Sequence, residues 1–465
     1  MEFNKIQFPD TWNKYSLDDV CSKITSGGTP SRTKPEFYEN GSINWVKTKE
    51  LNNYYIYDTE EKITEEALKK SSAKLLPTNT ILLAMYGATV GELGILSKEM
   101  ACNQACCALI TNPKICDYRY LFYLLAFHKE EIINLATGAA QQNISAKIIR
   151  ELTFRFPDID QQKEIVDVLN TLDKKIQLNT QINQTLEQIA QTIFKSWFID
   201  FDPVHAKANA LANGQTAEQA TQAAMAVISG KNTQELHRLQ TANPEQYQQL
   251  WEIAEAFPGG FDEEGVPRGW EQTTLSEVCS MKNGYAFKSS DWTEEGIPVI
   301  KIGSVKPMIV EVDGNGFVDE EHSVLHSEFL LTEGDIVVGL TGYVGEVGRI
   351  PQGRTAMLNQ RVAKFIPNKL NEQQDYYSFV YCLVRDKSFK AFAETNAKGS
   401  AQANISTKEL LNYSIILASP EIQMKFESLI KPLLDKILVN SGNNEYLSKV
   451  RDLLLPNLLS GEIHL

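Results

Sequence analysis

Two long segments of the chain carry a seam of mostly apolar residues at alternating steps of three and four. In residues 157–200 the seam is Leu169, Leu172, Ile176, Asn179, Asn183, Leu186, Ala190, Ile193 and Trp197. In residues 420–465 it is Ile430, Leu433, Ile437, Asn440, Asn444, Leu447, Arg451, Leu454 and Leu458, each 261 residues after its counterpart. Alternating steps of three and four are typical of a coiled coil. The pattern therefore predicts one long helix in each segment.

Each seam has two asparagines in its middle, Asn179 and Asn183 in the first and Asn440 and Asn444 in the second. A buried amide needs a polar partner, and a slipped register would leave it unpaired. In an antiparallel pair with aligned centres, Asn179 falls near Asn444 and Asn183 near Asn440. We therefore predict that the two helices pair with each other and that these asparagines set the register. The alternative is that each amphipathic helix packs on its own domain.

The residues that precede each helix form short apolar runs between glycine, proline and asparagine. Such runs are typical of strands joined by tight turns. The clearest runs are 81–85, 336–340 and 415–417. Short helices are expected at 118–135 and 376–392. Two β-rich globular units follow from this pattern, at residues 1–156 and 266–419.

The two β-rich units carry the same motifs in the same order. Offsets between the copies stay near 254 to 261 residues, which indicates an internal duplication. The matches include Leu17-x-x-Val20-Cys21-Ser22 with Leu275-x-x-Val278-Cys279-Ser280, Asn103-Gln104 with Asn359-Gln360, and Asn143-Ile144-Ser145 with Asn404-Ile405-Ser406.

Residues 201–265 have no counterpart in the second half. Pro203 ends the preceding helix, because proline cannot continue it. An Ala- and Gln-rich stretch over 206–229 and a helix-like stretch over 233–256 follow, and six acids with no Lys or Arg lie between Glu245 and Glu264. We interpret the segment as a partly helical insertion that serves as a solvated linker.

The composition is that of a globular protein without membrane-spanning segments. The chain has 465 residues, 43% hydrophobic and 22% charged, which is ordinary for globular domains. Its net charge of −14 argues against a simple basic nucleic-acid coat protein, although local basic loops remain compatible with DNA binding. No apolar run reaches transmembrane length, and the N-terminus does not look like a signal peptide. The seven cysteines lack the paired spacing of a zinc site, so we expect reduced thiols in the cytoplasm.

Searches for catalytic motifs are negative. The chain has no GxxxxGK[ST] phosphate loop and no Asp/Asn-Pro-Pro-aromatic run of the kind that amino-methyltransferases use. The glycines at 87–91 and 342–345 indicate tight loops rather than a nucleotide site, and His322 and His326 indicate surface histidines rather than a metal pair. The charged run 58–62 resembles a nuclease cluster only faintly and is expected to be a solvated face. The chain therefore resembles a reader or scaffold rather than a catalyst.

Basic loops with amide and hydroxyl side chains suit phosphate binding and base reading. Acid-free stretches lie at 21–35 and around Arg354, Arg361, Lys364 and Lys369. For any single cation, an ordinary surface role is an equal alternative. The candidate DNA-binding residues are Lys23, Ser26, Thr29, Ser31, Arg32, Lys34, Lys47, Lys49, Gln141, Asn143, Lys147, Lys282, Tyr285, Lys288, Lys301, Arg361, Lys398, Gln402, Asn404 and Lys408.

The ordered combination of motifs resembles the specificity subunits of type I restriction-modification systems across the whole chain. The residues that carry the resemblance are Trp12-x(4)-Leu17-x-x-Val20, Ser26-Gly27-Gly28-Thr29-Pro30-Ser31, Ile43-Asn44-Trp45-Val46-Lys47, Met85-Tyr86-Gly87-Ala88-Thr89-Val90-Gly91, Cys102-Asn103-Gln104-Ala105, Gln141-x-Asn143-Ile144-Ser145 and Phe198-x-Asp200-Phe201-Asp202-Pro203.

The resemblance implies an α+β fold in which two target-recognition domains are joined by two antiparallel coiled-coil helices. The implied boundaries are 1–156 and 266–419 for the domains, 157–200 and 420–465 for the helices, and 201–265 for the insertion. Each domain would read one half of a bipartite, asymmetric site in double-stranded DNA. The second domain has Asn283-Gly284-Tyr285-Ala286-Phe287 where the first has Ser26-Gly27-Gly28-Thr29-Pro30, so the two halves should read different sequences.

The resemblance also implies partners. The helices would dock two modification subunits that use S-adenosylmethionine to methylate adenine at N6. Restriction subunits, which are motor-nucleases that use ATP and magnesium, would join the complex. The chain itself would be non-catalytic, without cofactor or metal, cytoplasmic, away from membranes, and part of phage defence. The alternative from another class is a protein-interaction scaffold with the same duplicated architecture and no DNA target.

Overall fold

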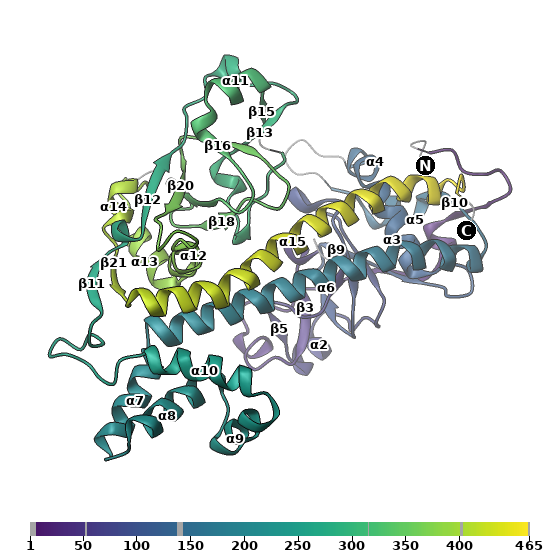
Figure 1. Ribbon diagram of the computed structural model, residues 1–465. Coiled ribbons are helices and arrows are strands. Elements are labelled where there is room, and N and C mark those ends of the chain that lie inside the picture. The colour runs from purple at the N-terminus through teal and green to yellow at the C-terminus, as the bar shows by residue number, and fades with distance from the viewer. Residues whose placement is uncertain (1–5, 52–53, 137–142, 315, 400–402, 464–465) are drawn as a thin grey trace. The chain divides into compact units, whose positions relative to one another are not determined.

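The computed structural model describes residues 6–51, 54–136, 143–314, 316–399 and 403–463. It divides into two compact units (Figure 1). The first unit contains Met1–Ile176 and Tyr446–Leu465, and the second contains Gln177–Glu445. Each unit therefore holds one β-rich domain together with parts of both long helices. In the described part of the chain, no helix combines the length and the apolar composition needed to cross a bilayer.

The β-rich domain of the first unit contains three sheets. A five-stranded sheet has the order β2-β9-β6-β7-β4, a three-stranded sheet has the order β5-β3-β8, and β1 pairs with β10. The centre of the larger sheet is β6, whose four residues are all buried. The strands are β1 (Asn13–Ser16), β2 (Cys21–Ser26), β3 (Ile43–Val46), β4 (Tyr55–Ile56), β5 (Lys62–Ile63), β6 (Ile81–Ala84), β7 (Leu93–Leu96), β8 (Ala101–Cys102), β9 (Cys106–Thr111) and β10 (Thr153–Phe156).

The β-rich domain of the second unit repeats this topology. Its five-stranded sheet has the order β12-β20-β17-β18-β14, its second sheet has the order β15-β13-β19-β16, and β11 pairs with β21. Only β16 has no strand counterpart in the first unit's described residues. The strands are β11 (Glu271–Thr274), β12 (Cys279–Asn283), β13 (Ile297–Ile300), β14 (Met308–Ile309), β15 (Phe317–Val318), β16 (Leu330–Leu331), β17 (Ile336–Gly339), β18 (Val347–Arg349), β19 (Ala356–Leu358), β20 (Val362–Pro367) and β21 (Ser414–Leu417). The sequence duplication is therefore a duplication of fold.

Short helices complete both domains, most of them capped by a Ser, Thr or Asp side chain at the N-terminus. They are α1 (Leu17–Val20), α2 (Glu65–Lys70), α5 (Ala146–Glu151), α11 (Glu320–Leu325) and α14 (Thr407–Leu411), with 3₁₀ turns at η1 (Pro35–Phe37), η2 (Thr48–Glu50), η3 (Gly87–Thr89), η4 (Leu275–Glu277), η5 (Ser289–Asp291), η6 (Ile302–Ser304) and η7 (Ser327–Phe329).

The prediction of one helix at 118–135 and one at 376–392 is wrong, because each region contains two helices. They are α3 (Tyr118–Phe127) and α4 (Lys129–Asn134), then α12 (Tyr377–Arg385) and α13 (Lys387–Asn396). The first break falls at His128, with ψ of 14°. The second falls at Asp386, which is extended and whose side chain accepts a hydrogen bond from the backbone N–H of Ser388. An apolar pattern continues across both breaks, so it could not reveal them.

The two predicted long helices are present as α6 (Ile159–Phe198) and α15 (Pro420–Leu459), each of 40 residues. None of the eighteen seam positions is exposed. The Nδ2 of Asn179 donates to Oδ1 of Asn444, and the Nδ2 of Asn440 donates to Oδ1 of Asn183, both at 2.8 Å. The sequence predicts these two pairs. Because the number of one partner falls as the other rises, the helices are antiparallel, and Figure 1 shows them side by side.

In the first unit, the ends of the helices pack with the β-rich domain. Leu169 of α6 and Leu458 of α15 belong to the same apolar cluster as Tyr120 of α3. The Nη1 of Arg451, a seam position that is not apolar, lies 2.8 Å from Oδ1 of Asp173 on α6. The domain and the helix pair therefore share one core.

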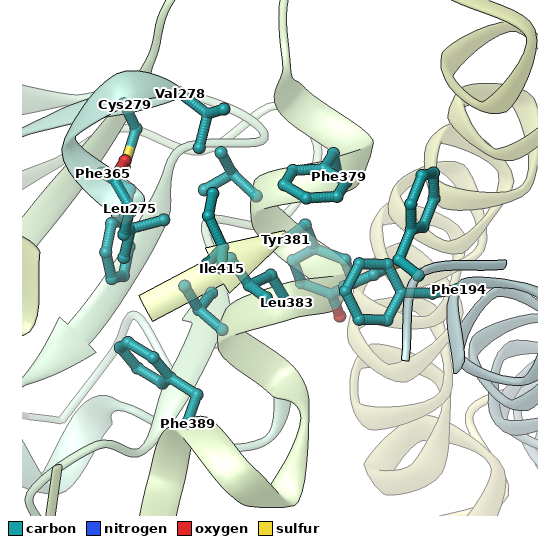
Figure 2. Close-up of a cluster of buried hydrophobic side chains, with 14 of the residues drawn as sticks. Phe194, Leu275, Val278, Cys279, Phe365, Phe379, Tyr381, Leu383, Phe389 and Ile415 are labelled. Atoms are coloured by element: carbon teal, nitrogen blue, oxygen red, sulfur yellow. The ribbon is translucent and has the colours of Figure 1, made fainter. Parts of the chain in front are cut away.

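The second unit repeats this arrangement with aromatic side chains. Phe194 of α6 lies between Phe379 of α12 and Phe426 of α15, with ring centroids 5.6 and 6.1 Å away. Figure 2 shows Phe194 beside the buried side chains of α12. The ring of Phe198, one turn further on, is 4.9 Å from that of Phe426. Burial of several aromatic rings at one point contributes both apolar area and preferred ring geometry.

Two buried carboxylates also hold α12 against the long helices of this unit. Glu427 of α15 accepts hydrogen bonds from the backbone N–H groups of Ser378 and Phe379, at 2.9 and 2.8 Å, in the first turn of α12. Burial raises the pKa of Glu427 to about 7. Glu187 of α6 accepts a hydrogen bond of 2.8 Å from the Tyr381 hydroxyl. These contacts fix the orientation of α12 as well as its burial.

The prediction that 201–265 is helical in part is confirmed, but the segment is folded and is not a solvated linker. The segment forms four helices, grouped together in Figure 1. Side chains of Thr216, Asn232 and Asn243 cap three of them, and Ala224, Met225, Leu236 and Ala254 form a small core. The helices are α7 (Asp202–Ala212), α8 (Ala217–Ser229), α9 (Thr233–Ala242) and α10 (Pro244–Ala256).

A buried lysine holds the insertion together, and an aromatic contact joins the insertion to α6. The Lys207 ammonium of α7 donates to the carbonyl oxygens of Ala254, Glu255 and Phe257, at 3.2, 3.0 and 2.6 Å. Burial lowers the pKa of Lys207. The ring of Phe257 packs edge-on against Trp197 of α6, with centroids 5.1 Å apart. Positive charge at the last carbonyls of a helix is favourable, so Lys207 both caps α10 and ties it to α7.

We expect Asn183→Leu to destabilise the helix pair by about 1–3 kcal/mol, because it leaves the buried Nδ2 of Asn440 without its acceptor. Asn440→Leu should cost a similar amount. The double variant should recover most of the loss, since two apolar side chains then face each other. Calorimetric unfolding of the four proteins tests this cycle. Purely additive losses in the double variant would show that the two amides are not coupled.

Candidate nucleic-acid interface

In both domains, a loop that follows a strand is pressed against the Asn-Gln motif. A Cβ on Gly27 would overlap the carbonyl oxygens of Cys102 and Asn103. A Cβ on Gly284, the counterpart, would overlap the carbonyl group of Asn359. Glycine is therefore required at both positions because the two backbones touch. This contact fixes where each loop starts.

The loop of the first domain is held at further points. The Trp45 indole Nε1 donates to the carbonyl oxygen of Gly28 at 3.0 Å. Thr29 is hydrogen-bonded to the side chain of Gln104, the second residue of the Asn-Gln motif. The backbone carbonyl of Ser26 accepts from Lys74 at 3.3 Å, and the hydroxyls of Ser31 and Thr33 are 2.8 Å apart. The candidate loop is thus built from backbone contacts and presents hydroxyl groups.

Three candidate cations of the first domain meet in one ion-pair network. Nη1 of Arg32 lies 2.7 Å from Oε2 of Glu61, and Nζ of Lys47 lies 2.7 Å from Oε1 of the same carboxylate. Lys47 also contacts Glu60 at 2.9 Å, and Lys49 pairs with Glu60. The structure therefore brings together Arg32, Lys47 and Lys49, which the sequence leaves up to seventeen positions apart.

The acids of this network come from the charged run 58–62. The run lies at the surface as expected, yet it is not simply solvated. Lys49 and then Lys47 lower the pKa of Glu60 to about 2, and Arg32 lowers that of Glu61. These carboxylates therefore stay charged at any physiological pH and offset part of the loop's positive charge.

The corresponding place in the second domain is built from aromatic rings. Lys301, the counterpart of Lys47, has its Nζ 3.9 Å from the ring centroid of Trp292. Tyr285 stacks on His326, with centroids 4.0 Å apart and rings inclined by 28°. Lys282 lies over the ring of Phe329 at 4.8 Å. The same loop position thus carries different chemistry in the two domains.

The remaining candidates of the first domain are spread over its surface. Lys23 on β2 and Lys147 on α5 are exposed. Lys34 is exposed and lies over the ring of Phe37 at 5.1 Å. Asn143 forms a bridge with the backbone of Tyr86. Gln141 lies outside the described residues.

In the second domain, Lys288, Arg361 and Lys408 are exposed. Lys398 pairs with Glu409 at 2.5 Å. Asn404 accepts a hydrogen bond of 3.1 Å from the Thr341 hydroxyl, in a bridge equivalent to that of Asn143 and Tyr86. Gln402 lies outside the described residues.

The stretch around Arg354 is free of acids in sequence but not in space. Arg354 pairs with Asp313 and with Glu445 of α15. Lys364 lies 2.7 Å from Asp335. Lys369 lies 3.7 Å from Asp375 but its side chain stays 73% exposed, and Arg361 is exposed as well. Two of the four cations therefore keep the exposure expected of a phosphate-binding residue, whereas Arg354 and Lys364 are paired with acids from other segments.

Several residues that contact the two loops are not among the DNA-binding candidates predicted from the sequence. Gln104, Lys74 and Glu61 contact the first loop, and Trp292 and His326 contact the second. Repetition of the Asn-Gln motif in both halves could have indicated Gln104. The other four carry no repeated pattern, so only the fold reveals them.

The chain matches the family model described as "Type I restriction modification DNA specificity domain" at residues 9–188 and again at 267–448. The chain belongs to this family. The two matches coincide with the duplicated halves, and each begins in a β-rich domain and continues into a long helix.

Relatives of this family match along nearly the whole chain. The specificity subunit of the type I restriction enzyme HindI from Haemophilus influenzae is 30% identical over 97% of this chain and 99% of the relative. The specificity subunit of the type I restriction enzyme MjaIX from Methanocaldococcus jannaschii is 27% identical, over 98% of this chain and 94% of the relative. Both names describe specificity subunits of type I restriction enzymes.

A solved structure shares the fold. The S subunit of a type I restriction-modification system from M. genitalium superposes with a TM-score of 0.51 at 18% identity, covering 98% of this chain and 97% of the other. This likeness concerns the fold. Among the described residues, no cluster of three or more His, Cys, Asp or Glu side chains is arranged to hold a metal ion.

We expect Gly284→Ala to destabilise the second domain by about 1–3 kcal/mol, because the new methyl group overlaps the Asn359 backbone. Gly303→Ala in the same domain is the matched control, since a Cβ there meets nothing within 4 Å. Thermal unfolding of both variants measures the difference. Equal midpoints for the two variants would contradict the close approach of the loop.

Proposed function

We propose that this chain is the DNA-reading subunit of a type I restriction-modification complex and that each β-rich domain reads one half of a bipartite, asymmetric site. The observation that carries the proposal is a single domain fold made twice, with different side chains on the same loop. Two domains with the same fold would bind a DNA duplex in the same orientation. Different loop chemistry would select different bases.

In this proposal the target-recognition domains are residues 1–156 and 266–419. Helices at 157–200 and 420–465 join them, and the insertion occupies 201–265. The helix bounds of α6 and α15 support these divisions. The candidate cations would contact phosphates, which gives affinity without sequence preference. Amide, hydroxyl and ring side chains of the loops would contact base edges.

The chain is proposed to dock two modification subunits, which would hold S-adenosylmethionine and methylate adenine at N6. Restriction subunits that use ATP and magnesium would complete the complex, in the cytoplasm. The relatives from Haemophilus influenzae and Methanocaldococcus jannaschii support this proposal, because their names place them in type I restriction enzymes. This chain would contribute recognition, and its partners would contribute the chemistry.

The helix pair is proposed to set the length of the DNA between the half-sites. Amide pairs in an apolar seam specify one register. One helix therefore cannot shift along the other, and the length of the helix pair stays fixed. Four asparagines, Asn179, Asn183, Asn440 and Asn444, would carry this role. A rigid spacer of this kind favours a fixed number of unread base pairs.

We expect the unread spacer to lengthen when both helices are lengthened together. Seven residues inserted between Ile176 and Gln177 and between Glu445 and Tyr446 keep the heptad seam and add about 10.5 Å. At about 3.4 Å per base pair, the preferred spacer should grow by roughly three base pairs. Sequencing of methylated adenines in a host that expresses the complex measures the change.

The matched control inserts the same heptad into α6 alone. That variant cannot keep both the asparagine pairs and the contact of Asp173 with Arg451 in register, and it should lose both stability and methylation. An unchanged number of unread base pairs in the double insertion would contradict the proposal that the helix pair sets the spacer length. Absence of site-specific methylation and of salt-dependent duplex binding by the unaltered complex would instead favour a protein scaffold without a DNA target.

A further inference from the structure

Arg32 is held from several sides in the loop of the first domain. Its guanidinium carbon lies 4.3 Å from the ring centroid of Tyr38 and 5.2 Å from that of Trp45. Its Nη1 lies 2.7 Å from the Glu61 carboxylate. Even so, 53% of its side chain is exposed. An arginine that is both restrained and exposed has few reasons to be built for stability alone.

We propose that Arg32 reads the guanine of one G·C pair in the half-site of the first domain and that Glu61 positions it. This inference rests on the proposed function and adds to it a named base and a named residue. Arginine pairs bidentately with the O6 and N7 atoms of guanine in the major groove, which makes guanine the base that its fork selects.

The carboxylate argues for base reading rather than phosphate binding. A phosphate contact depends on net positive charge, and Glu61 offsets that of Arg32. Directional hydrogen bonding survives this neutralisation, because the contact of Nη1 with Glu61 does not occupy the whole guanidinium. The guanidinium has five N–H groups, so a fork remains that can face a base. Lys34, exposed two residues later, has the opposite character, because it forms no ion pair with a carboxylate in the described part of the chain.

The restraint also lowers the cost of recognition. A free arginine side chain loses rotamer freedom when it docks, which weakens binding. The Tyr38 ring and the Glu61 carboxylate order Arg32 before any DNA arrives. A guanidinium that cannot change its orientation cannot form hydrogen bonds with the wrong base, so its preference for guanine is larger.

In the described residues of the second domain, no carboxylate positions an arginine at the corresponding place. In the first domain Ile63 of β5 pairs with Ile43, and in the second Val318 of β15 pairs with Ile297. Glu61 lies two residues before Ile63, and Gly316 lies two residues before Val318, so Gly316 is the counterpart of Glu61. Glycine has no side chain to position an arginine. Lys301 lies on Trp292 instead. The second domain thus serves as an internal control within the same molecule.

The test is the methylation motif of the complex formed by the full chain and its modification subunit, expressed in a host without such methylation. We expect a bipartite motif with a G·C pair in one half-site. Arg32→Ala and Arg32→Lys should both relax the preference for that pair by about tenfold or more, with the other half-site unchanged. Arg32→Lys keeps the positive charge but not the two parallel N–H donors. Loss of the guanine preference in this variant would therefore show that the guanidinium geometry, and not the charge, reads the base.

Glu61→Gln should relax the same position partially and no other, since it removes the charge that orients Arg32. Lys34→Ala should lower methylation at all sites without changing any letter of the motif, as expected for a phosphate contact. Thermal midpoints near that of the unaltered complex establish that the variants fold.

The outcomes separate the two proposals. A motif without a G·C pair in either half-site would overturn the role of Arg32. The same conclusion follows if Arg32→Ala lowers methylation uniformly and every base preference remains. In both cases a bipartite motif would leave the proposed function intact. A complex that methylates no defined site would remove the proposed function itself, and this inference with it.

Discussion

The architecture depends on two amide pairs in an otherwise mostly apolar helix seam. Apolar layers alone bring helices together in several registers of similar energy, and the hydrogen bonds of Asn179 with Asn444 and of Asn183 with Asn440 favour one of them. Both β-rich domains pack their cores onto these helices, through Leu169 and Leu458 in one unit and Phe194 in the other. A shift of the seam would therefore disturb every domain contact at once.

Duplication separates what the fold requires from what recognition requires. Sheet order, the glycine contact with the Asn-Gln motif and the bridge at Asn143 or Asn404 are shared by both domains. Side chains on the loops are not shared: Arg32 faces Tyr38 and Glu61 in one domain, whereas Lys301 faces Trp292 in the other. The shared backbone contact fixes the start of each loop, so the side chains beyond it can differ while the scaffold stays the same.

Local periodicity explains which features the sequence could predict. The helices, their antiparallel pairing and the partners of the asparagines follow from a seam that repeats every seven residues. The folded insertion was missed because its core uses small residues such as Ala224 and Ala254, which give a weak apolar signal. Charge balance at the loops was missed because the acids come from afar, as Glu61 does for Arg32 and Glu445 for Arg354. Contacts of this kind depend on tertiary structure.

We propose that the two β-rich domains read different sequences and that the helix pair fixes the number of base pairs between them. Sequencing of methylated adenines in a host that expresses the unaltered chain with its modification subunit tests this proposal most directly. We expect two different short sequences separated by one fixed number of unread base pairs. One continuous sequence, two identical half-sites, or half-sites at variable separation would contradict it.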